Sequence, residues 1–61
     1  MVWYLQIQDR DGKVLLLNRA VGTFSKYSKR VDNAADKIVA NFPTAWRWEV
    51  RPKPYGQKAV L

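Results

Sequence analysis

The segment from residue 28 to residue 43 is the one stretch with a strong helical periodicity. It constrains the possible folds of the chain more than any other segment. Its apolar residues recur with the i, i+3, i+4, i+7 spacing of a single helix face: Val31, Ala34, Ala35, Ile38, Val39 and Phe42. Ser28 is the predicted N-cap, with Ser25 as the alternative if the helix starts a turn earlier. Pro43 is expected to stop the helix because it has no N–H and restricts the preceding residue. A lone helix of this length is marginal in water, so we expect its apolar face to pack on a sheet.

The segment before the helix predicts a β-hairpin. Residues 2–8 are rich in β-branched and aromatic residues, with Trp3, Leu5 and Ile7 on one side of the expected strand. An Asp-Gly turn at residues 9–12 leads into a second strand at 13–18. The apolar run at 14–17 does not alternate, so we expect both faces of this strand to be at least partly covered, and its register is left open.

Residues 19–27 are the least determined part of the chain. Gly22 permits a turn, and Val21, Phe24 and Tyr27 would either anchor a loop to the sheet or extend the helix backwards. Residues 44–51 alternate cleanly and predict a third strand. Pro52 and Pro54 end that strand, since neither can donate to a ladder.

These elements predict an α+β fold of the type β-β-α-β. A right-handed crossover through the helix gives a three-stranded antiparallel sheet of order 2-1-3, with the helix on one face. The expected bed of the helix is Trp3, Leu5, Ile7, Trp46, Trp48 and Val50. Residues 1–54 form a single domain, and residues 55–61 form a short C-terminal tail that Tyr55 and the last apolar residues would tie down.

The composition favours an acidic partner. The chain has 61 residues and a net charge of +6, from 11 basic and five acidic residues. Such a balance suits nucleic acid, an anionic membrane surface or an acidic protein patch, although charge alone also keeps small domains soluble. The start of the chain has no basic n-region and no long apolar run, so we expect a cytoplasmic protein (in the host cytoplasm, if viral) with no membrane partner.

The sequence has few of the residue types that commonly act in catalysis. Histidine and cysteine are absent from the sequence, so the usual general base and strong nucleophile are missing. Asp9 and Asp11 fit turn chemistry better than metal binding, and Asp32 and Asp36 fit a solvated helix face. We expect no enzyme, no cofactor and no metal site.

Two surfaces are candidates for binding. The first is a basic helix stripe of Lys26, Arg30, Asn33 and Lys37, which would suit phosphate contact if the helix reaches back to Lys26. An ordinary solvated face explains this stripe about equally well.

The second surface is the sheet face without a helix. It would carry Tyr4, Gln6, Arg47, Glu49 and Arg51, with Leu15 and Leu17 or their neighbours. Aromatic and arginine side chains are enriched at protein interfaces, and they also hold single-stranded nucleic acid. The loop at Phe24 and the tail from Tyr55 could instead shield this face.

The two surfaces give two sets of candidate residues. The predicted partner-binding residues are Tyr4, Arg47, Glu49 and Arg51, with Trp46 or Trp48 as apolar anchors if they are exposed. The alternative nucleic-acid-binding set is Lys26, Arg30, Lys37, Arg47 and Arg51.

A resemblance points to the first set. A strand hairpin with the aromatic start Trp3-Tyr4, one helix, and a last strand ending Val50-Arg51-Pro52 resembles the small podophage inhibitors of host bacterial RNA polymerase. The resemblance implies a small phage protein that binds and inhibits a host complex with an acidic patch, with Arg51 among the binding residues. The family's preceding arginine falls on Glu49 here, and its glutamate-rich helix is replaced by a more basic one.

A second resemblance supports the alternative. The turn from Asp9 to Lys13, followed by a helix, is similar to the arm-binding domains of phage integrases, which lay a sheet in the DNA major groove. It implies a small basic DNA- or RNA-binding module. We expect a monomer or a weak dimer in either case.

Overall fold

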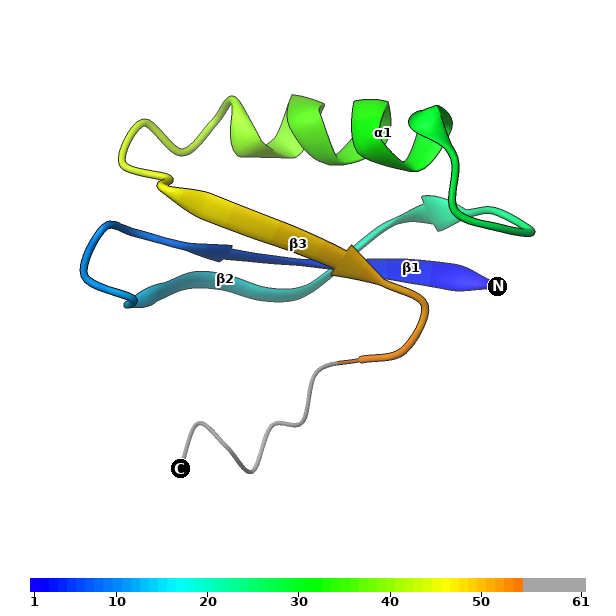
Figure 1. The fold of residues 1–61 in the computed structure, drawn as a ribbon, viewed down its shortest axis with the longest axis horizontal. Helices are drawn as coiled ribbons and strands as arrows, with labels where there is room; N and C mark the ends of the chain where they lie inside the picture. Colours follow the sequence, from blue (N-terminus) through cyan, green and yellow to red (C-terminus); the bar gives the residue numbers. More distant parts are fainter. Residues whose placement is uncertain (55–61) are drawn as a thin grey trace.

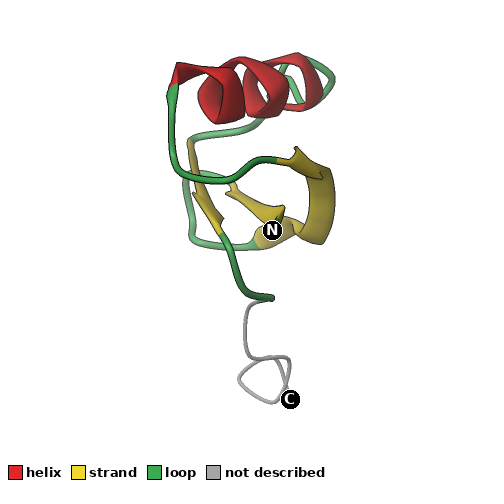
Figure 2. Ribbon diagram, turned by 90° about the vertical axis from the view of Figure 1, so that its right-hand side faces the viewer, coloured by secondary structure: helices red, strands yellow, loops and turns green. Residues whose placement is uncertain are grey.

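The computed structural model describes residues 1–54, and the tail expected at 55–61 lies outside the described residues. The elements follow in the order β1 (Val2–Gln8), β2 (Val14–Thr23), α1 (Lys29–Val39) and β3 (Arg47–Arg51) (Figure 1). β1 pairs antiparallel with both of the other strands, giving the sheet order β2-β1-β3. Figure 2 shows α1 lying across one face of the sheet. The α+β fold and the strand order predicted from the sequence are confirmed.

The helix begins where its predicted cap lies. Ser28 has an extended backbone, and its Oγ accepts a hydrogen bond from the Arg30 N–H at 3.3 Å. α1 ends at Val39, four residues before Pro43. After the helix, the backbone forms i→i−3 hydrogen bonds of the 3₁₀ type. Asn41 N donates to Ile38 O, and Phe42 N donates to Val39 O. The helix therefore does not run as far as the proline.

The first turn is organised by the carboxylate of Asp9. One oxygen, Oδ1, accepts from the backbone N–H groups of Asp11 and Lys13, each at 2.9 Å. The Gly12 N–H donates to the Asp9 carbonyl at 3.1 Å, and Gly12 adopts a φ of 86°. An Asx turn followed by a glycine with positive φ is typical turn chemistry and confirms the predicted hairpin.

β2 is longer than the sequence predicted. The strand expected at 13–18 extends from Val14 to Thr23, so the prediction of a loop or helix extension over residues 19–23 is wrong. Its pairing with β1 shifts register three times, and the non-glycine residue Asn18 has a φ of 57°. Bulges of this kind reset which face a side chain takes. They explain why the run at 14–17 does not alternate, and each of its four residues is half-buried.

The segment after β2 is tied to the start of β1. The Phe24 N–H donates to the Met1 carbonyl at 2.9 Å, and the Phe24 carbonyl accepts from the Trp3 Nε1–H at 3.2 Å. The ring of Tyr27 lies against that of Trp3, with 5.9 Å between centroids. Phe24 and Tyr27 therefore anchor this connection to the sheet, one of the two roles expected for them.

β3 is shorter than the predicted strand at 44–51. It starts at Arg47, and Trp46 N–H donates to the Gln8 carbonyl at 2.8 Å just outside the strand. Trp46 is 65% exposed, so the prediction that it forms part of the helix bed is wrong. Because Trp46 lies outside β3, the alternation that puts Trp48 and Val50 under α1 does not reach it.

The core lies between α1 and one face of the sheet. Within residues 1–54 the buried apolar side chains are Trp3, Leu5, Ile7, Val31 and Ala35. Partly buried residues of β2, α1 and β3, and of the segment before β3, pack against Leu5, Ile7 and Ala35; they include Ile38, Phe42, Trp48 and Val50. No charged or polar residue of this part of the chain is buried. No helix in it is long and apolar enough to cross a membrane.

Candidate interaction surface

The face of the sheet opposite α1 is built from alternate residues of β1 and β3. The strand register places Tyr4 opposite Arg51, Gln6 opposite Glu49, and Gln8 opposite Arg47. In β1 the intervening residues Trp3, Leu5 and Ile7 are buried, so these polar partners lie on the other face. We call Tyr4, Gln6, Gln8, Arg47, Glu49 and Arg51 the open face.

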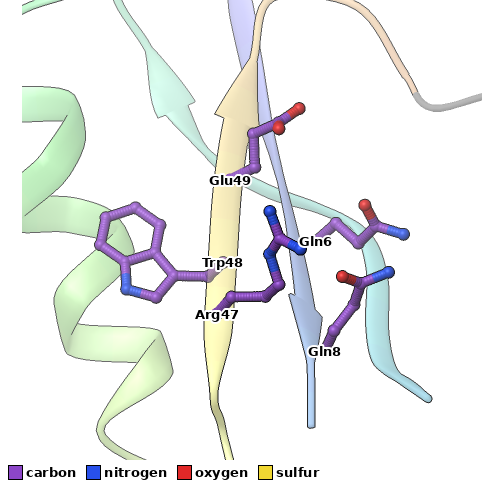
Figure 3. A pocket seen from close by; sticks show the side chains of 5 residues that line it. All are labelled: Gln6, Gln8, Arg47, Trp48 and Glu49. Atoms are coloured by element: carbon purple, nitrogen blue, oxygen red, sulfur yellow. The ribbon is translucent and has the colours of Figure 1, made fainter. Parts of the chain in front are cut away.

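Figure 3 shows how four of these side chains are arranged around a shallow hollow. Gln6, Gln8, Arg47 and Glu49 extend on one side of the sheet, whereas Trp48 extends towards the helix. The hollow has a volume of about 210 Å³ and is lined by these five residues. Apart from Trp48, its walls are amide, guanidinium and carboxylate groups, which offer hydrogen bonds and charge rather than the mostly apolar lining of a small-molecule pocket.

The structure brings the predicted partner-binding residues together. Tyr4, Arg47, Glu49 and Arg51 all belong to the open face, and the three residues of β3 are exposed. Of the two tryptophans proposed as anchors, Trp46 is exposed and Trp48 is half-buried on the helix side. Trp48 therefore does not meet the condition on which it was proposed.

Two residues outside the predicted partner-binding set lie on this surface or next to it. Gln8 lines the hollow, and Arg10 in the first turn places its guanidinium carbon 5.4 Å from the ring centroid of Trp46. The period-two alternation of β1 put Gln8 on the same side as Tyr4 and Gln6, and this was the signal that could have identified it. No pattern in the sequence indicated the contact between Arg10 and Trp46.

The alternative nucleic-acid set is divided between opposite sides of the molecule. Arg30 and Lys37 are exposed on α1, whereas Arg47 and Arg51 lie on the face of the sheet that α1 does not cover. Lys26 lies in the loop before the helix, because α1 begins at Lys29. The condition that the helix reaches back to Lys26 is therefore not met, and no single surface carries all five residues.

A second hollow lies beside the start of α1. It has a volume of about 320 Å³ and is lined by Thr23, Phe24, Ser25, Lys26, Ser28 and Arg30. Two of these residues are cationic and three carry hydroxyl groups. This is the part of the helix side that best suits a phosphate group.

Near this hollow, a tyrosine and a carboxylate link the loop to the helix. The Tyr27 hydroxyl donates to Asp32 Oδ2 at 2.5 Å. This hydrogen bond to the carboxylate, supported by desolvation and by the carboxylate's charge, raises the pKa of Tyr27 above its ordinary value of 10.0. The tyrosine is therefore a neutral hydrogen-bond donor at physiological pH.

The described residues contain no group of three acidic, histidine or cysteine side chains that could hold a metal ion. Comparison with protein-family models, with curated proteins and with solved structures gave no match. The features of the described residues that bear on function are the open face, the two hollows and the exposed Trp46.

Proposed function

We propose that this chain is a small non-enzymatic binding protein that docks its open face on an acidic surface of a partner protein and blocks that partner. The observation that carries the proposal is the clustering of Tyr4, Arg47, Glu49 and Arg51 on one uncovered sheet face. Tyrosine and arginine are the residue types that most often supply the binding energy of protein interfaces.

The charges of β3 define the surface that would be complementary to it. Arg47, Glu49 and Arg51 alternate in sign along one side of the strand. At a rise of about 3.3 Å per residue, the two arginines lie roughly 13 Å apart with the carboxylate between them. A partner with two carboxylates flanking a cation would make three charge-assisted contacts with this strand.

The central glutamate favours a protein over a nucleic acid. A phosphate backbone presents negative charges only, so Glu49 would repel it at the middle of the open face. A protein surface can place a lysine or arginine opposite Glu49 and carboxylates opposite its neighbours. The resemblance to phage inhibitors suggests bacterial RNA polymerase as the partner to test first.

The test is direct binding of purified bacterial RNA polymerase to the immobilised chain, together with capture from bacterial lysate with and without nuclease. Arg51→Glu is the test variant and Lys37→Glu is its control, because both change the net charge equally but on opposite sides of the molecule. We expect Arg51→Glu to abolish binding of a nuclease-resistant protein while Lys37→Glu preserves it. Both sites are exposed and neither belongs to the buried core, so we expect both variants to fold, which circular dichroism and urea unfolding check.

The hollow beside Lys26 and Arg30 supports a second candidate function, nucleic-acid binding. That function predicts recovery of nucleic acid alone, with an affinity that falls steeply as salt is raised. It also predicts that Arg30→Glu and Lys37→Glu weaken binding while Arg51→Glu has little effect. This outcome would replace the protein-binding proposal.

A further inference from the structure

Trp46 is the most exposed of the large apolar side chains in residues 1–54, at 65%. It directly precedes β3, in which the neighbouring Trp48 is half-buried under α1. An exposed tryptophan leaves a large apolar area in water, and burying that area in an interface would be favourable.

Trp46 is held by one contact to its backbone and one to its ring. Its backbone N–H donates to the Gln8 carbonyl at 2.8 Å, which fixes the main chain against the end of β1. The guanidinium carbon of Arg10 lies 5.4 Å from the ring centroid, within the range of a cation–π contact. A side chain that is already ordered loses less conformational entropy when it binds.

Trp46 is also continuous with the open face. Arg47 is the next residue and lines the hollow together with Gln8, whose carbonyl holds Trp46. A partner lying on the open face would therefore reach the tryptophan at the end of the sheet where the β1–β2 turn lies.

We propose that Trp46, positioned by Arg10, is the principal anchor of the interface and enters an apolar recess of the partner protein. This inference rests on the proposed function. Arg10 and Arg47 flank the ring in space and in sequence, so the rim of that recess would carry carboxylates. The partner segment is accordingly one in which aromatic or aliphatic side chains stand beside aspartate or glutamate.

An exposed tryptophan could also stack on the bases of single-stranded nucleic acid. The carboxylates nearby argue for a protein instead. Asp9 and Asp11 flank Arg10 in the turn, and Glu49 lies between Arg47 and Arg51 on the open face, so charges of both signs surround Trp46. A protein can place carboxylates opposite the arginines and cations opposite these carboxylates, whereas a phosphate backbone carries negative charge only.

The experiment is selection of a displayed library of random peptides on the immobilised chain, followed by affinity measurements of the selected peptides on variants. We expect the selected sequences to combine apolar and acidic residues. Trp46→Ala should weaken their binding about 30-fold or more, the effect typical of an interface hot spot. Arg10→Glu, which keeps the ring and reverses the charge beside it, should cause a smaller loss, and Lys37→Glu should cause none.

Circular dichroism and urea unfolding establish whether each variant folds. If Trp46→Ala does not fold, the affinity of the peptides for Arg10→Glu, compared with the parent, tests the proposal. Peptides that bind Trp46→Ala as tightly as the parent but lose binding to Arg47→Glu would overturn the anchor and leave the proposed function standing. Peptides indifferent to both substitutions, or a library with no binders, would overturn both. In a parallel titration with oligothymidylate, binding that depends on Trp46 would replace the protein partner with single-stranded nucleic acid.

Discussion

Gly22 lies directly opposite Trp3 in the β1–β2 ladder, and the ring of Phe24 occupies the space into which a side chain at position 22 would project. A Cβ at this position would lie 2.8 Å from Phe24 Cε2, and the backbone has a φ of 154°. Gly22→Ala should therefore lower the free energy of unfolding by about 1–3 kcal/mol, through backbone strain and displacement of the phenyl ring. Urea denaturation followed by circular dichroism measures this loss.

Gly12→Ala is the matched control for this substitution. Gly12 also has a positive φ, 86°, but no atom lies within 4 Å of the added Cβ. Only backbone strain remains there, at about 1 kcal/mol. Equal losses for the two variants would mean that Phe24 moves aside without a penalty.

Leu5 is fully buried in the centre of β1, so its truncation should be severe. Leu5→Ala is expected to cost about 2–5 kcal/mol, because it removes buried methyl groups and leaves a cavity. A domain of this size has a total stability of roughly 3–9 kcal/mol, so much of the variant should be unfolded at room temperature. Val2→Ala, at an exposed position of the same strand, should change stability by less than about 1 kcal/mol in the same urea titration.

The hydrogen bond from Tyr27 to Asp32 should contribute stability that depends on alkaline pH. The pKa of Tyr27 is raised in the folded state. The stability from this hydrogen bond is therefore complete below the unfolded pKa of 10.0 and is lost as the pH rises through the higher folded pKa. Tyr27→Phe should therefore be less stable than the parent near neutral pH, and the difference should diminish above pH 10.0. Urea titrations of both proteins across this range test the prediction, which a pH-independent difference would contradict.

The carboxylate of Asp9 holds two backbone donors of the hairpin turn. Asp9→Ala should cost about 1–2 kcal/mol by leaving the Asp11 and Lys13 amides to water and loosening the turn. Asp11→Ala is the natural comparison, because Asp11 contributes its backbone amide to the turn. Hydrogen exchange of the Lys13 amide should accelerate in Asp9→Ala and remain near the parent rate in Asp11→Ala.

The elements with one dominant local signal could be predicted from the sequence. The bounds of β1 follow from its β-branched and aromatic residues, and the start of α1 follows from Ser28 and the apolar spacing behind it. The strand order follows from the chirality of the crossover. These features depend on neighbouring residues or on general topology rather than on particular tertiary contacts.

The features that the sequence did not reveal depend on contacts between distant residues. β2 continues through Gly22 because the Val2 and Trp3 backbones are there to pair with its end, and this long-range pairing overrides the turn preference of a glycine. Trp46 fits the alternation of β3, yet it lies outside the strand with Arg10 against its ring. The open face was foreseen from alternation alone and Trp46 was foreseen as an anchor if exposed, whereas the contact of Arg10 with its ring was not.

Because β1 and β2 differ in length, we expect the length of this hairpin to vary among homologous proteins. β2 uses ten residues where β1 uses seven, and the three extra residues are taken up at the three register shifts. Deleting one residue at such a site, for example Asn18, would convert an irregular pairing into a regular one without moving the Asp9 turn or the Phe24 anchor. Related chains should therefore differ in length within β2, while β1 and β3, whose pairing with each other is unbroken, keep a constant length.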